Sequence, residues 1–146
     1  MQPPEGLQVA YSNGGTVVQT LTTPAVAGAT YTLGVMMGNR NHGCCSFTNT
    51  AMELWAGPTL IGRRIVTSAE APPRGAWARY TATFTAAGNL PAGQLLEIRL
   101  DAVSSQTDFD VVTLEQDGGC AADFNRDGFL DFFDYDDFVT AFEQGC

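Results

Sequence analysis

The chain contains no lysine, a single histidine and no long apolar run, and each shortage excludes a class of function. Seven arginines against sixteen acidic residues give a net charge of -9. Nucleic acid is therefore not an expected partner, because contacts to phosphates need a basic patch. No stretch approaches the roughly twenty apolar residues that a membrane-spanning helix requires. His42 is the one imidazole and no serine lies in a GxSxG turn, so a serine-hydrolase triad is not expected.

The acidic residues are concentrated at the C-terminal end of the chain. Residues 117–146 hold eight acids and one arginine, whereas residues 1–116 hold eight acids and six arginines. Hydrophobic residues make up 45% of the 146, which is enough for one packed core with a small appendage. The sequence therefore predicts two domains, residues 1–116 and residues 117–146.

Apolar and polar residues alternate in short segments through residues 7–115, between breaks rich in glycine, proline and asparagine. This pattern is typical of β-strands. The expected strands are residues 7–11, 16–21, 30–37, 51–55, 60–66, 77–85, 95–101 and 109–115. Asn13-Gly14-Gly15 predicts a hairpin turn between the first two. Eight short strands at this spacing predict a two-sheet β-sandwich of jelly-roll type.

The acidic residues of the C-terminal segment are spaced like the ligands of a calcium-binding loop. Calcium takes six to eight oxygens at about 2.3–2.6 Å, and an EF-hand-type loop supplies them from positions 1, 3, 5, 7, 9 and 12. The expected ligands are Asp123, Asn125, Asp127, Phe129 through its carbonyl oxygen, Asp131 and Asp134. Ca²⁺ is therefore the expected cofactor. The alternative is an acidic disordered tail, which the interleaved aromatic residues disfavour.

Aromatic residues recur at steps of three and four after this loop, so residues 132–143 are expected to form an amphipathic helix. Residues 123–142 resemble one dockerin repeat, and the flanking Cys120 and Gly145-Cys146 resemble the GC-type dockerin-like tails of bacterial secreted proteins. The resemblance implies a calcium-dependent attachment element. Its docking surface would comprise Phe132, Phe133, Tyr135 and Phe138. Since the repeat stands alone, a protein partner or self-association of two chains is expected to cover that surface.

Four cysteines allow three pairings. We expect the disulfides Cys120–Cys146 and Cys44–Cys45, with free thiols or a loop-to-tail pairing as open alternatives because the second bridge joins adjacent residues. Zinc at this cysteine pair and His42 is disfavoured, since four spaced ligands are lacking. A disulfide and a calcium site together indicate an extracellular or cell-surface location, although the first residues carry no secretory signal.

The strand order from TYTLGVMMG to TDFDVVTLE resembles the galactose-binding-like jelly rolls of bacterial surface proteins. Carbohydrate-binding modules and the calcium-dependent hapalindole-type cyclases share that framework. The resemblance implies a second calcium site at Asp110 in the last strand. It also implies binding of a polysaccharide or glycan, for which Trp55, Glu53 and Trp77 are the candidate ligand-binding residues. The alternative is that either tryptophan simply covers the core or an edge.

Catalysis is the less favoured interpretation. The carboxylates available to a hydrolase are Glu53, Glu97, Asp101, Asp108 and Asp110. A cyclase-like acid catalyst is implied only by resemblance, and similarity of fold does not transfer function. The sequence favours a secreted or cell-surface, non-catalytic carbohydrate-binding sandwich joined to a calcium-dependent attachment element. The alternatives are an adhesive protein-binding module and a calcium-dependent enzyme of cyclase or hydrolase type.

Overall fold

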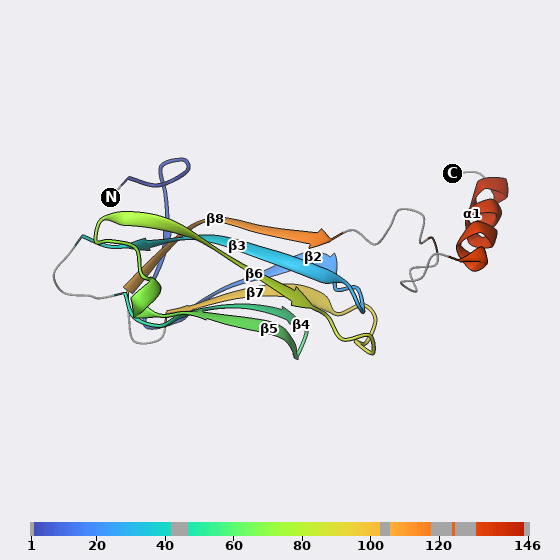
Figure 1. The fold of residues 1–146 in the computed structure, drawn as a ribbon, viewed down its shortest axis with the longest axis horizontal. Helices are drawn as coiled ribbons and strands as arrows, with labels where there is room; N and C mark the ends of the chain where they lie inside the picture. The colour runs from blue at the N-terminus through green and yellow to red at the C-terminus, as the bar shows by residue number, and fades with distance from the viewer. Residues whose placement is uncertain (1, 42–46, 103–105, 118–123, 125–130, 145–146) are drawn as a thin grey trace. The chain divides into compact units, whose positions relative to one another are not determined.

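The computed structural model describes residues 2–41, 47–102, 106–117, 124 and 131–144 (Figure 1). The chain divides into two compact units, Met1–Gln116 and Asp117–Cys146. The first unit consists of strands and the second carries a helix, so each is described by itself.

In its described ranges, the first unit forms eight strands and one short 3-10 helix. They are β1 (Ala10–Asn13), β2 (Thr16–Pro24), β3 (Thr30–Asn39), β4 (Thr50–Ala56), β5 (Thr59–Val66), η1 (Ser68–Glu70), β6 (Ala76–Thr85), β7 (Leu95–Ala102) and β8 (Gln106–Asp117). The strands form two sheets in the orders β1-β8-β3-β6 and β2-β7-β4-β5. All the strand pairings described are antiparallel. The predicted mainly-β, two-sheet sandwich is confirmed.

The core lies between the two sheets because successive side chains of a strand point to opposite faces. On β3, the side chains at alternate positions from Tyr31 to Met37 are buried. The facing sheet contributes Met52, Leu54 and Ala56 from β4 and Leu96, Ile98 and Leu100 from β7. The positions between these residues therefore point outward on each sheet, and they are where a functional site on the strands must be sought.

The predicted hairpin at residues 13–15 is wrong. β1 pairs with β8 and β2 pairs with β7, so this turn carries the chain from one sheet to the other. Gly14 has a φ of 78°, which a residue without a β-carbon adopts readily. The Ser12 hydroxyl accepts a hydrogen bond from the Gly15 N–H at 2.9 Å, which stabilises the turn. The first strand also begins later than expected, at Ala10.

The helix of the second unit, α1 (Phe132–Gln144), agrees with the predicted one. Its start is fixed by two carboxylates. Asp131 Oδ1 accepts from the Phe133 N–H at 2.8 Å, and Asp134 Oδ2 accepts from the Asp131 N–H at 3.0 Å. Asp131 thus serves as the N-cap through the N–H of the second helical residue, and Asp134 returns a bond to the Asp131 N–H, which resembles a capping box. Within the described ranges, no helix is long and apolar enough to cross a membrane.

Candidate functional site

One carboxyl group of the sandwich is buried on a face where carboxyls are normally solvated. Phe109 of β8 is part of the core and Thr107 bonds across it to Thr50 Oγ1 at 2.7 Å, so both side chains point inward. Asp108 lies between them and therefore points to the outer face of the β1-β8-β3-β6 sheet. Its exposure is nevertheless only 4%. An outward acid that water hardly reaches is a candidate catalytic group.

Two side chains from the neighbouring strands lie beside Asp108. Tyr11 of β1 is its direct partner in the antiparallel ladder. Arg40 follows the last residue of β3, the strand on the other side of β8. The Arg40 guanidinium carbon lies 5.7 Å from the centroid of the Tyr11 ring. A side chain that starts beside β3 and reaches a ring on β1 must pass over β8, so this cation–π pair covers the position of Asp108.

The electrostatic surroundings of Asp108 favour its protonated form. Burial raises the pKa of the Asp108 carboxyl, and the positive charge of Arg40 offsets this only in part. No hydrogen bond to the carboxyl comes from any residue in the described part of the chain. The carboxyl is therefore suited to hold a proton and deliver it to a bound molecule, which is the role of a general acid.

Residues 2–5 are tied to the same sheet at two points. The Trp77 indole N–H on β6 donates to the Gln2 carbonyl at 2.9 Å, and the Glu5 N–H donates to Asp110 Oδ2 on β8 at 3.1 Å. Trp77, one of the predicted ligand-binding residues, thus uses its indole N–H within the chain. Asp110 Oδ1 accepts from the Val111 N–H at 2.8 Å.

The calcium site expected at Asp110 stays a prediction. No group of three or more histidine, cysteine, aspartate or glutamate side chains that could hold a metal is found among the described residues. Both carboxylate oxygens of Asp110 accept a backbone N–H, from Glu5 and from Val111.

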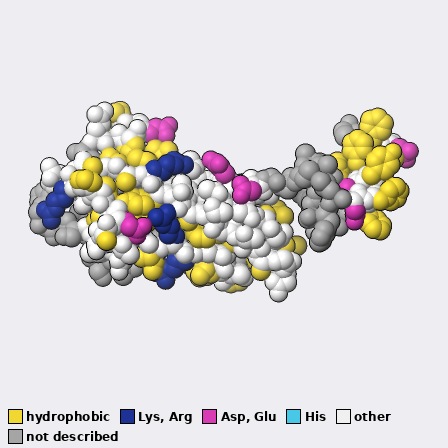
Figure 2. Space-filling model, viewed as in Figure 1, with side chains coloured by type: hydrophobic (Ala, Val, Ile, Leu, Met, Phe, Trp, Pro, Cys, Tyr) yellow, Lys and Arg dark blue, Asp and Glu magenta, His cyan; other side chains and the backbone are white. Residues whose placement is uncertain are grey.

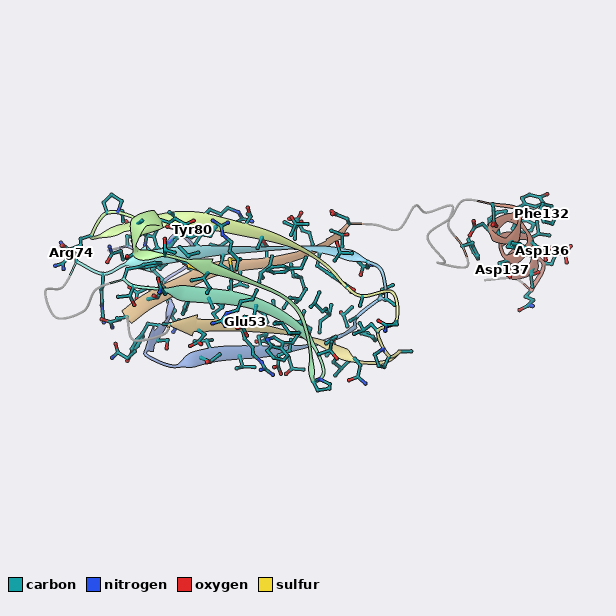
Figure 3. All side chains as sticks on the ribbon, turned by 60° about the horizontal axis from the view of Figure 1, so that its bottom comes forward. Glu53, Arg74, Tyr80, Phe132, Asp136 and Asp137 are labelled. Carbon is teal, nitrogen blue, oxygen red and sulfur yellow. The ribbon has the colours of Figure 1, made fainter. Side chains whose placement is uncertain are left out.

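The other predicted ligand-binding residues lie together on the outer face of the β2-β7-β4-β5 sheet. Glu53 lies on β4 (Figure 3). It accepts the Trp55 indole N–H at 2.7 Å and pairs with Arg63 Nε at 3.1 Å. The Arg99 guanidinium carbon lies 4.1 Å from the centroid of the Trp55 ring, and Arg99 Nε pairs with Glu97 at 2.6 Å. These groups partner one another and one face of the indole is occupied, so the cluster stabilises the sheet.

The predicted metal ligands of the second unit are only partly within the described residues. Asp123, Asn125, Asp127 and Phe129 lie outside them, as do Cys44, Cys45, Cys120 and Cys146, so the loop and both expected disulfides stay predictions. Asp131 and Asp134 cap α1, and Asp134 is 4% exposed. Figure 2 shows hydrophobic side chains gathered on this helix. The predicted docking residues Phe132, Phe133, Tyr135 and Phe138 are all exposed.

The sequence did not single out Tyr11 and Arg40, and it offered Asp108 only as one of five carboxylates. If Phe109 is recognised as a core residue, the alternation of side chains along a strand places Asp108 on the outer face. The pairing of Tyr11 with Asp108, however, depends on the register between strands at opposite ends of the domain. No local pattern encodes that register.

Comparison with known proteins identifies cyclases. The family model described as HpiC1-like, HpiC1 cyclase, matches residues 1–115. A Stig cyclase, Fisc, from Fischerella sp. TAU in complex with (3Z)-3-(1-methyl-2-pyrrolidinylidene)-3H-indole is 30% identical, with a TM-score of 0.65 over 78% of this chain and 65% of that one. A cyclase from Fischerella sp. TAU in complex with 4-(1H-indol-3-yl)butan-2-one is 31% identical, with a TM-score of 0.63 over 78% and 66%. No curated protein matches the sequence.

The coverage of the cyclases and one further comparison limit this likeness. The chain spans about two thirds of the length of these cyclases. A carbohydrate-binding module described as CBM4 is 15% identical, with a TM-score of 0.53 over 74% of this chain and 70% of that one, and therefore shows the shared fold alone.

These findings overturn the main functional interpretation of the sequence. The dockerin identification is wrong, because no dockerin or EF-hand family is found and the matching model is that of a cyclase. The non-catalytic carbohydrate-binding assignment is wrong too, because the carbohydrate-binding neighbours are only about half as similar in sequence as the cyclases. The cyclase alternative is the better supported one. The chain belongs to the HpiC1-like cyclase family.

Proposed function

We propose that the sandwich is a cyclase that closes rings by acid catalysis, with Asp108 as the proton donor. The observation that carries the proposal is the family match over residues 1–115. The buried Asp108 carboxyl is the group that could donate the proton. The two related cyclases were crystallised with indole-containing molecules. An aromatic, indole-bearing small molecule is therefore the proposed class of substrate.

The reaction needs no oxidant or reductant. The proton of the Asp108 carboxyl passes to the substrate, and the carbon that becomes electron-poor accepts the electron pair of a carbon–carbon double bond. A new carbon–carbon bond forms, and the product then loses a proton, which restores the acid. Substrate and product are isomers of equal mass. Burial favours this chemistry because an acid with a raised pKa still carries its proton at a pH where an ordinary aspartate has lost it.

The test compares the full chain with its Asp108→Asn variant on a panel of indole-bearing alkenes. We expect wild type to convert at least one of them into an isomer of unchanged mass, detected by chromatography with mass spectrometry. Asp108→Asn should lower the rate by about 10²–10⁴, the usual contribution of a general acid. Asp101→Asn, an outward residue of β7 on the other sheet, is the matched control and should keep the activity. Full activity of Asp108→Asn would refute the assignment.

We propose further that residues 117–146 form a separate domain that binds calcium through the predicted loop. The buried Asp134 carboxylate beside Asp131 at the start of α1 supports this, because both are hard oxygen donors held close together. When bound, the ion would fix the loop in front of the helix. We propose that a second copy of the chain or a protein partner covers the exposed aromatic residues of α1. We also propose a location outside the cell.

A further inference from the structure

The cation–π contact between Arg40 and Tyr11 is weak and lies beside the buried Asp108 carboxyl. Tyr11 is 58% exposed although it lies directly opposite a carboxyl that is 4% exposed. Arg40 forms no ion pair with a carboxylate of the described residues. Its guanidinium instead stacks on the Tyr11 ring, and such exposed cation–π contacts are weak. Within the described residues, the Arg40 guanidinium is therefore held near Asp108 by this weak contact and by its attraction to the carboxyl, without an ion pair.

A flat aromatic molecule offers Tyr11 a better partner than the guanidinium. Ring–ring contacts between aromatic groups bury more apolar surface, and the guanidinium regains its hydration when it is released. The exchange brings the ring of the incoming molecule to the strand beside Asp108. The same movement uncovers the carboxyl, so binding and access to the acid are coupled.

We propose that Tyr11 is the seat for the aromatic ring of the substrate and that Arg40 is a displaceable cover, whose place on Tyr11 the substrate takes. The inference rests on the proposed cyclase function and identifies Tyr11 and Arg40 as the residues that position the substrate ring and control its access to Asp108. It selects flat, uncharged ring systems such as indoles over aliphatic molecules, because only a π-system replaces the contact that is lost.

Substitution of Tyr11 should weaken binding whereas substitution of Arg40 should not, which makes the test sharp. The probe is 4-(1H-indol-3-yl)butan-2-one, titrated into the full chain by calorimetry and followed by backbone amide shifts at residues 11 and 108. We expect Tyr11→Leu to weaken binding about three- to tenfold, because the ring contact is lost. Arg40→Leu should bind unchanged or about two- to fivefold more tightly, because the competitor is gone.

Matched variants separate this mechanism from other causes. Tyr11→Phe keeps the ring and should bind like wild type, and so should Tyr135→Leu, which removes an exposed tyrosine of the other unit. Unchanged binding in Tyr11→Leu would overturn the proposal. A loss in Arg40→Leu as large as in Tyr11→Leu would also overturn it, because Arg40 would then hold the ligand itself.

The binding readout is independent of catalysis. Asp108→Asn is expected to keep probe binding while it loses ring closure. A wrong role for Tyr11 would therefore appear in the binding titration, and a wrong role for Asp108 would appear in the conversion assay. If wild type does not bind the probe at all, the inference is refuted for indole rings, while the conversion assay still judges Asp108.

Discussion

Asp108 differs from the other outward carboxylates of the sandwich in the partners it lacks. Glu97 accepts from Arg99 and from the Thr20 hydroxyl, and these two bonds lower the pKa of Glu97. Glu53 is nearly as buried as Asp108, but an arginine and an indole N–H partner it. Asp108 is buried beside a stacked arginine and receives no hydrogen bond from the described residues. The same chemical group thus has opposite tendencies within one domain, and the difference arises from its neighbours.

The raised pKa of Asp108 makes a prediction about stability. A carboxyl whose pKa is higher in the folded state binds more protons there than in the unfolded chain. Its contribution to the free energy of unfolding is therefore largest at low pH and is lost as pH rises from the unfolded pKa through the folded one. Asp108→Asn removes this loss, so the variant should gain stability relative to wild type across that interval.

Thermal unfolding of both proteins at a series of pH values checks this. The difference between their midpoints is the relevant quantity, because Glu70 and Glu97, whose pKa values are lowered, change the stability of both proteins alike with the opposite sign. A difference that does not vary with pH would show that Asp108 titrates like a solvated aspartate.

The strands follow from the sequence more fully than their assembly does. Burial of one face of a strand produces an alternation of apolar residues that can be read from a short stretch of sequence. This alternation predicts seven of the eight strands with errors of a few residues at their ends. The sheet to which β1 and β2 belong is not local. Asn13-Gly14-Gly15 suits a hairpin and a sheet-crossing turn equally well, and only the pairing with distant β8 and β7 decides between them. Tyr11 reaches Asp108 through that same pairing.

Close contact between β5 and β6 depends on one glycine. A β-carbon at Gly62 would lie 2.1 Å from Phe84 Cδ1 and 2.9 Å from Phe84 Cβ, so Phe84 or β5 must shift to admit a larger residue there. Gly62→Ala should destabilise the sandwich by about 1–3 kcal/mol, the usual cost of overpacking. Gly88→Ala meets no atom within 4 Å and is the matched control. Chemical denaturation measures both, and equal stability of the two variants would contradict the packing argument.

The chain as a whole consists of two units of different composition, a nearly neutral sandwich and an acidic helical segment. If the second unit binds calcium, the ion should stabilise that unit alone. Calcium at a hundredfold excess over its dissociation constant would add about 2.7 kcal/mol to its unfolding free energy. Calorimetry of the full chain with calcium or chelator should therefore shift one transition and leave the other in place.

Two substitutions on α1 sharpen the calcium prediction. Asp134→Asn removes one charged oxygen of the predicted site and should abolish most of the shift. Asp136→Asn changes an exposed aspartate of the same helix and should retain it. A calcium-induced shift that is equal in both variants would indicate that the ion acts through general charge screening.

β8 is both the strand that carries Asp108 and the strand that ends at the boundary with the second unit, at Asp117. Any tension applied to the C-terminal segment is therefore transmitted along β8 first. The strand lies between β1 and β3 and is hydrogen-bonded to both. β1 is short, with four residues, and is the weaker of the two flanks. We therefore expect pulling on the C-terminal segment to separate β1 from β8 first, and with it Tyr11 from Asp108.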